Sequence, residues 1–298
     1  MKVSIEHDGH FIPEDIKNTT IRIVEQSLES ITTINGKFVV NNTLFFRRQS
    51  SGRVTPCVMN SASYLSGNFQ KNLASYAGCQ GETCILEQNI DGFITARHIG
   101  EGYKIQEKNK LLEVIHRYIE ANNLPEHTIY NLFPMFYRMY VHSGIYDISR
   151  LPNDVKHLFK PQSLNLDFRI GVEFETGNVA SSFRAINKLA YLYQSGKIDA
   201  GVFITSIDKS SSATQIWPVS NRNGSFQELY QRKFTNQISL PLICIGFAPD
   251  YFDSKAPYLG KGMTLYNPIP TGEDDNSGSY SIFLDQDKAP IFLPKGAI

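Results

Sequence analysis

The sequence predicts an α/β protein in which helices cover a central β-sheet. Three observations predict this fold class. After Pro152, apolar segments of strand length alternate with segments of helical periodicity. The chain has 298 residues, enough for a sizeable core, and 41% of them are hydrophobic while 19% are charged, which is typical of a globular protein. Alternating strands and helices build a sheet with helices packed on its faces.

The first half of the chain has weaker patterns. Apolar residues recur at helical spacing from Ile12 to Ile31, which predicts an amphipathic helix. Residues 35–102 are rich in Ser, Asn and Gly around short apolar stretches, which indicates short strands and long loops. Two further helices are expected, one at 105–123 with a single apolar face and one at 127–141 with aromatic residues on several sides.

The second half alternates more clearly. We expect strands at 166–176, 200–207 and 240–247, with helices at 180–194 and 225–234. The acidic segment TGEDDNSGS near the end is expected to be a solvated tail. The longest apolar run, 240–248, is too short to span a bilayer, and the first residues lack a signal-peptide core, so we expect a cytoplasmic protein without a membrane partner. The 29 basic and 29 acidic residues cancel, so a site for a polyanion must come from local clustering.

Two glutamates stand one residue apart at the end of the strand expected at 166–176. Glu173 and Glu175 share a face because alternate side chains of a strand point the same way. Their backbones would be about 6–7 Å apart, close enough for both carboxylates to serve one hard cation, or one cation and a water. The alternative is a half-exposed strand whose outer face happens to be acidic.

The residues that follow favour a site for an anion beside these carboxylates. Gly177 and Asn178 supply a turn, and Asn178 or Ser181 can cap the next helix. Exposed amide groups and the dipole at a helix N-terminus suit a phosphate, and Arg184 and Lys188 add positive charge. Acidic groups for a metal next to basic groups for an anion indicate phosphodiester chemistry.

The stretch GVEFETGNVASSFRAINKL, residues 171–189, resembles the catalytic segment of the BamHI-like type II restriction endonucleases, the BamHI/BglII group. The likeness continues through SGKIDAGVFITSI, RNGSFQEL and LPLICIGFAPDYFDSKAPYLGKG, and covers about 168–262 with a weaker extension back to about 111. It implies a PD-(D/E)xK restriction-endonuclease-like core with a central mixed β-sheet flanked by helices. Residues 105–298 would form this core and residues 1–104 an N-terminal extension, within one compact domain overall.

The resemblance also implies Mg²⁺ as cofactor, bound by Glu173, by the Phe174 carbonyl and by an aspartate from another segment. Asp154 lies 19 residues before Glu173, far enough to return on a neighbouring strand, and it matches the family's Asp-Val step. Asp147 is the fallback. Asp167 is excluded because six residues of extended strand would separate it from Glu173 by roughly 20 Å. A turn or helix-cap aspartate is the alternative interpretation of Asp154 and Asp147.

Two further acids have roles that the resemblance implies. Glu175 occupies the position of the usual lysine and would orient or deprotonate the attacking water. Glu120 resembles an acidic residue that approaches the family's site from a helix, although an exposed helix-end glutamate is the alternative. The implied reaction is double-strand cleavage at a short palindromic site that leaves 5′-phosphates.

Sequence recognition requires side chains that match the edges of the bases in the major groove. The residues at or near positions where the family contacts DNA are Asn178, Ala180, Ser181, Arg184, Asn221 and Arg222. Ala180 replaces a serine of the family pattern and Asn221 replaces an aspartate, so a different target sequence is possible. A turn-former, a helix-surface charge and a loop charge are the ordinary interpretations of Asn178, Arg184 and Arg222.

The partners follow from the same resemblance. A palindrome in double-stranded DNA presents the same half-site twice, which predicts a homodimer. A cognate methyltransferase is expected in the same system but not as a stable partner. Arg47, Arg48 and Arg53, in a region mostly outside the resemblance, could clamp backbone phosphates, with an ordinary solvated loop as the alternative. The alternative function is a related non-restriction nuclease or a DNA-binding module of the same fold.

Overall fold

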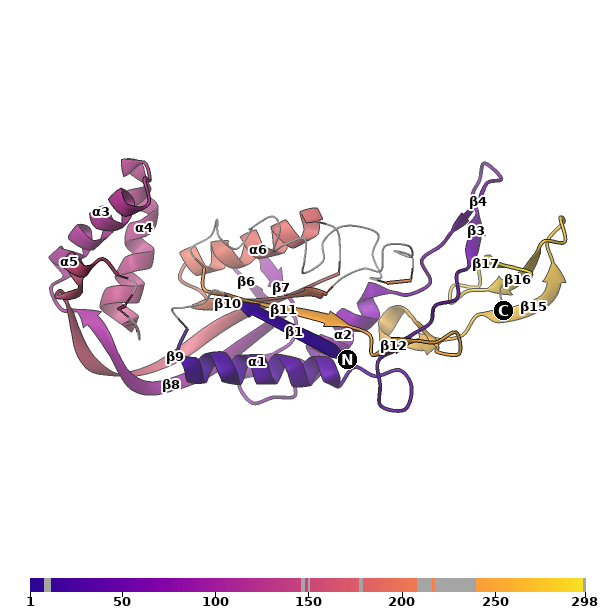
Figure 1. Cartoon of the computed structure of the whole chain (residues 1–298), viewed down its shortest axis with the longest axis horizontal. Coiled ribbons are helices and arrows are strands. Elements are labelled where there is room, and N and C mark those ends of the chain that lie inside the picture. The colour runs from indigo at the N-terminus through magenta and orange to yellow at the C-terminus, as the bar shows by residue number, and fades with distance from the viewer. Residues whose placement is uncertain are drawn as a thin grey trace.

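The computed structural model describes residues 1–7, 12–145, 148–149, 151–176, 179–207, 216–217 and 240–296. Within these residues a six-stranded sheet has the strand order β1-β11-β10-β9-β8-β5 (Figure 1). Its strands are β1 (Lys2–His7), β5 (Cys79–Gln80), β8 (Gly92–Ile105), β9 (Phe159–Glu175), β10 (Ala200–Ser206) and β11 (Leu242–Ala248). Strands β9, β10 and β11 are parallel, whereas β1, β8 and β5 pair antiparallel with their neighbours. The predicted mixed sheet is confirmed.

Helices cover both faces of this central sheet. Helices α1 (Glu14–Glu29) and α2 (Ala62–Leu73) lie on one face, and α6 (Val179–Gln194) lies on the other (Figure 1). Alternate residues of β10 point into two different cores: Val202 and Ile204 pack with α1 and α2, and Phe203 packs with α6. Because both faces are buried, β10 and β11 read as continuous apolar runs.

Strands β8 and β9 form one long antiparallel hairpin, paired from Gly92 and Val172 at one end to Ile105 and Phe159 at the other. Residues 106–158, here called the helical insertion, connect the two strands at that second end, on the left of Figure 1. The helices of this insertion are η1 (Lys108–Lys110), α3 (Leu111–Ala121), η2 (Glu126–Thr128), α4 (Ile129–Phe136), the π-helical turn η3 (Tyr137–Ser143) and α5 (Asn153–Lys156).

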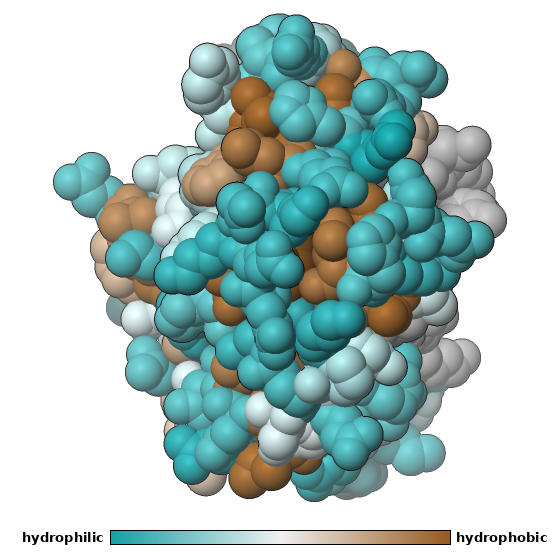
Figure 2. All heavy atoms as spheres, turned by 90° about the vertical axis from the view of Figure 1, so that its left-hand side faces the viewer, coloured by the Kyte–Doolittle hydropathy of each residue, from teal (hydrophilic) through white to brown (hydrophobic). Residues whose placement is uncertain are grey.

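The outer face of the helical insertion is mixed in character. Figure 2 views the molecule from this end and shows hydrophobic patches separated by hydrophilic residues. Tyr130 of α4 is 80% exposed, and Leu112 and Phe133 are also exposed. The inner face contributes Leu111, Ile115 and other apolar residues to the core that contains α6. The insertion therefore covers the α6 side of the sheet and leaves its outer side to solvent.

A second sheet joins the two ends of the chain. Among the described residues it has five strands in the order β15-β16-β17-β3-β4, here called the terminal sheet. Its strands are β3 (Phe46–Arg48), β4 (Val54–Pro56), β15 (Ile269–Asp274), β16 (Tyr280–Leu284) and β17 (Pro290–Pro294). The remaining short elements are β2 (Val39–Val40), β6 (Thr83–Ile85), β7 (Gln88–Ile90), β12 (Tyr251–Phe252), β13 (Tyr258–Leu259), η5 (Lys261–Met263) and β14 (Leu265–Tyr266).

Most predicted elements are confirmed with shifted ends, and two expectations need correction. The expected boundary at residue 104 falls inside β8, and the region before it supplies β1 and β5 to the central sheet. The acidic segment expected to be a solvated tail forms the end of β15 and the connection to β16, and its buried Asp275 accepts hydrogen bonds from the Ser279 and Tyr280 amides and from Arg48. The helix expected at 225–234 lies outside the described residues. In the part that is described, every helix is too short or too polar to cross a membrane.

Candidate active site

The candidate site lies where β9 ends. Glu173 is only 4% exposed and Glu175 is half-buried, and both lie on the opposite side of the strand from Phe174. The Phe174 ring packs against Phe69 and Phe247, with ring centroids 5.3 and 5.1 Å away. This packing fixes the end of β9, so that the two carboxylates are held on the face turned toward α6.

Asp91 is the residue that the structure adds to this pair. Strand β8 begins at Gly92, which pairs with Val172, so Asp91 precedes β8 at the end where Glu173 lies. Its Oδ2 accepts a hydrogen bond of 2.9 Å from the Phe174 amide, and its Oδ1 accepts one of 2.8 Å from Gln70 of α2. These two bonds hold the Asp91 carboxylate beside the end of β9.

Burial sets the protonation of these acids. Burial raises the pKa of Asp91, and the hydrogen bonds from Phe174 and Gln70 oppose this rise. Burial raises the pKa of Glu173 to about 8; the ammonium of Lys188 lowers it, while the nearby charges of Asp91 and Glu175 raise it. Three neighbouring carboxylates in a poorly solvated place therefore favour the uptake of a cation.

Helix α6 brings two positive charges to the same place. Lys188 Nζ lies 2.7 Å from Glu173 Oε1 and also donates to the Asn89 carbonyl of β7. Arg184 lies one turn nearer the helix start, and its guanidinium donates to the Ser181 hydroxyl over 3.4 Å. Because α6 begins four residues after Glu175, its N-terminal end and both cations lie beside the carboxylates.

These groups line one open cavity of about 480 Å³. Its wall is formed by the end of β9, by α6, by Asp91 and by Ala62 and Ser66 of α2. The atoms that could bind a metal here are carboxylate and carbonyl oxygens, the ligand type that Mg²⁺ prefers. Among the described residues no three acidic, histidine or cysteine side chains converge as a complete metal cage. One or two carboxylates still suit Mg²⁺, which usually completes its shell with waters and substrate phosphates.

The structure brings together some of the residues predicted for this site. Glu173, Phe174, Glu175, Ser181 and Arg184 all line the cavity. Ala180 is exposed in the first turn of α6. The predicted DNA-contacting residues Asn178, Asn221 and Arg222, and the fallback aspartate Asp147, lie outside the described residues.

Asp154 and Glu120 do not lie at this site, which corrects both predictions. Both belong to the helical insertion, where Arg117 pairs with Asp154 at 3.1 Å and with Glu120 at 2.9 Å. Strand β9 starts only at Phe159, and the 14 residue steps from there to Glu173 extend on the order of 45 Å. Asp154 is an exposed helix-start aspartate and Glu120 an exposed helix-end glutamate, as their ordinary interpretations predict.

Asp91 escaped prediction because it lies 82 residues before Glu173 in the sequence. A signal was present: Asp91 and Gly92 precede the alternating segment FITARHI, which could have been paired with the strand that leads to Glu173. Gly92 matters here because an added Cβ would lie 2.3 Å from Leu73 Cδ2 and 3.3 Å from Val172 Cβ. A larger residue next to Asp91 would therefore have to displace the buried Leu73 side chain.

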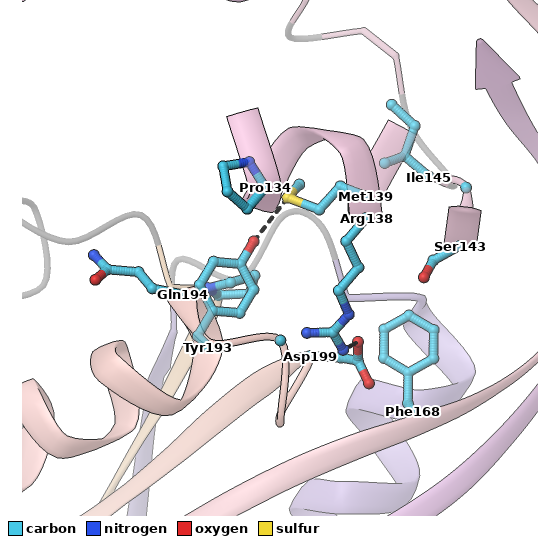
Figure 3. A pocket seen from close by; sticks show the side chains of 12 residues that line it. Pro134, Arg138, Met139, Ser143, Ile145, Phe168, Tyr193, Gln194 and Asp199 are labelled. Carbon is cyan, nitrogen blue, oxygen red and sulfur yellow. Dashed lines mark hydrogen bonds and ion pairs between the residues drawn. The ribbon is translucent and has the colours of Figure 1, made fainter. Parts of the chain in front are cut away.

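A second cavity lies between the helical insertion and the central sheet (Figure 3), and it shares no lining residue with the first. Its two charged side chains are paired with each other: Arg138 of η3 forms an ion pair with Asp199 and donates to the Ile198 carbonyl at 3.0 Å. Asp199 also pairs with Arg169 of β9 at 3.1 Å. This cavity marks a junction that anchors the insertion.

The arginines proposed as a DNA clamp are partly neutralised. In the terminal sheet Arg47 pairs with Asp285 at 2.5 Å and Arg48 pairs with Asp275 at 3.1 Å. Both aspartates are buried, whereas both arginines are exposed at their outer sides. These pairs give Arg47 and Arg48 a role in holding β3 against the C-terminal strands.

Comparisons with known proteins identify the family of this chain. The family model described as "Restriction endonuclease BamHI" matches residues 1–274. The type II restriction enzyme BamHI of Bacillus amyloliquefaciens is 33% identical over 94 residues, which are 32% of this chain. The matched segment spans 41% of that enzyme's length. The family match includes the acidic end of β9, Asp91 and α6, and the chain belongs to the BamHI restriction endonuclease family.

Proposed function

We propose that this protein is a type II restriction endonuclease, a site-specific deoxyribonuclease that cleaves both strands of DNA at a short palindrome with Mg²⁺ and leaves 5′-phosphates. One observation carries the proposal: Asp91, Glu173 and Glu175 line the same cavity as Arg184 and Lys188. Family membership supports the reaction type.

Asp91, Glu173 and the Phe174 carbonyl would hold the metal, with Asp91 taking the role first assigned to Asp154. A bound Mg²⁺ acidifies water and neutralises the charge that develops on the phosphate. The Phe174 amide and Gln70 keep Asp91 oriented, because each donates to one of its oxygens. Activation of the water and binding of the phosphate are assigned to residues of β9 and α6.

Glu175 would orient and deprotonate the attacking water. It is less buried than Glu173, lies on the same side of β9 and lines the same cavity. Arg184 and the first amide groups of α6 would bind the scissile phosphate, since a helix N-terminus and a guanidinium both favour an anion. Attack of the water in line with the P–O3′ bond would break that bond, so that one new end carries a 3′-hydroxyl and the other a 5′-phosphate.

Base recognition is assigned to Asn178 just before α6, to the first residues of α6, and to Asn221 and Arg222. Asn178, Ala180, Ser181, Arg184, Asn221 and Arg222 form this proposed set. A two-fold homodimer would apply the set to each half-site. Such an enzyme would act in the cytoplasm beside a methyltransferase that protects the host's own sites.

The direct test is incubation of the purified protein with unmethylated phage DNA and Mg²⁺. Discrete fragments with common 5′-phosphorylated ends are expected, and sequencing those ends gives the recognition site. DNA that is retarded in a gel but stays intact would instead support a DNA-binding module. Fragments with random ends would indicate a nuclease outside restriction.

A further inference from the structure

Lys188 connects three segments at the candidate site. It extends from α6, lies 2.7 Å from Glu173 Oε1 on β9, and donates to the Asn89 carbonyl of β7, two residues before Asp91. Its charge is also felt at Asp91. A carboxylate as buried as Glu173 needs a paired charge or a proton, and the ammonium of Lys188 supplies the charge.

We propose that Lys188 is the resident counterion of the metal-free site, and that binding of a divalent cation at Glu173 releases its ammonium for contact with DNA phosphate. This inference rests on the proposed function, because it takes Glu173 as a metal ligand. The ammonium lies at contact distance from the carboxylate oxygen that the metal would bind. Two cations on one oxygen repel each other strongly at such distances, so the metal displaces the lysine.

The released Lys188 ammonium lies near the place where a DNA phosphate is expected to bind. Lys188 follows Arg184 by four residues, so the two lie on the same face of α6 and line the same cavity. Arg184 lies toward the helix N-terminus, where a phosphate is favoured. Lys188 therefore changes partner, from a carboxylate in the free enzyme to a phosphate oxygen in the complex, and acts as a positioning residue.

This exchange predicts opposite effects on two binding reactions. Lys188→Met removes the competitor for Glu173, so Mn²⁺ measured alone by electron paramagnetic resonance should bind more tightly, by about tenfold. DNA binding in the presence of Ca²⁺ should weaken. The slope of its salt dependence should fall by the amount that corresponds to about one phosphate contact. A purely structural lysine would weaken both reactions when removed.

Two variants serve as controls. Lys197→Met removes one exposed positive charge just beyond the other end of α6 and should change neither binding constant. Lys188→Arg keeps the charge and should restore Mn²⁺ affinity to near the original value. Unchanged or weaker Mn²⁺ binding by a folded Lys188→Met variant overturns the inference while leaving the proposed function intact. An unaltered protein that neither binds Mn²⁺ nor cleaves DNA overturns both.

A measurement on the unaltered protein covers the case in which Lys188→Met does not fold. Lysine acetylation followed by mass spectrometry reports how accessible each ammonium is. Addition of Mn²⁺ without DNA should raise the rate at Lys188 and leave Lys197 unchanged. A rate at Lys188 that stays the same or falls shows that the ion pair with Glu173 persists, and overturns the inference.

Discussion

Replacing Asp91 by Asn tests the central assignment of the site. The change keeps the shape of the side chain but removes one of the carboxylates that line the cavity. If Asp91 holds the metal, single-turnover cleavage should fall by about 10²–10³-fold, the usual cost of losing one charge-stabilising group at a reacting centre. Binding of Mn²⁺ should weaken as well.

The effect on stability should be small, because two consequences oppose each other. Asp91 accepts from both Phe174 and Gln70, and an asparagine can accept with only one of its two atoms, so one hydrogen bond worth about 1 kcal/mol is lost. Removing the charge also ends its repulsion with Glu173, which raises the pKa of that glutamate. Thermal unfolding in metal-free buffer measures the balance, and normal cooperative unfolding shows that lost cleavage is chemical.

Asp154→Asn is the matched control. It makes the same substitution at the aspartate that the sequence favoured, where the partner is the exposed Arg117 of the helical insertion. Cleavage and Mn²⁺ binding should stay as in the unaltered protein. The reasoning is refuted if Asp91→Asn cleaves normally and Asp154→Asn is inactive.

Three further predictions follow from the charges. Because burial raises the pKa of Glu173 from 4.5 to about 8 despite the nearby Lys188, the carboxyl of the folded metal-free protein exchanges its proton for the ion pair with Lys188 as pH rises through that window, and the stability should fall there; Glu173→Gln should flatten this part of the curve in urea titrations. Arg138→Met should lower the free energy of unfolding by about 1–3 kcal/mol, since Asp199 loses one of two partners, and leave cleavage by the folded protein largely intact. Arg47→Ala should destabilise the terminal sheet, because buried Asp285 loses its partner, and should leave the salt dependence of DNA binding unchanged. If the slope of the logarithm of the binding constant against the logarithm of the salt concentration falls by about one in magnitude, Arg47 contacts a DNA phosphate after all.

What could be predicted from the sequence was local. Glu173 and Glu175 share a side of β9 because they are two residues apart, and α6 could be placed from its apolar spacing and the turn before it. The site's third acid depends on a strand pairing. Asp91 lies beside Glu173 only because β8 and β9 are in register over 14 paired positions, and no pattern within either strand fixes that register.

The same limit applies to the terminal sheet. Strand β3 pairs with β17, so Phe46 lies opposite Phe292, almost the whole chain apart. The segment that contains Asp275 looked like a tail because its composition is acidic, and composition does not reveal that Arg48 neutralises it. Contacts between the ends of a chain are fixed by tertiary packing, which sequence patterns of short range do not encode.

The hairpin of β8 and β9 also explains how the site coexists with a large insertion. The helical insertion joins the strands at Ile105 and Phe159, whereas Asp91 and Glu173 lie at the opposite end. Fourteen paired residues hold the acids together whatever connects the far end, so the insertion does not form the catalytic geometry. It still matters for folding, because its apolar residues pack in the core that includes Leu189 of α6. Since α6 also carries Arg184 and Lys188, the insertion supports the site through the helix that delivers its cations.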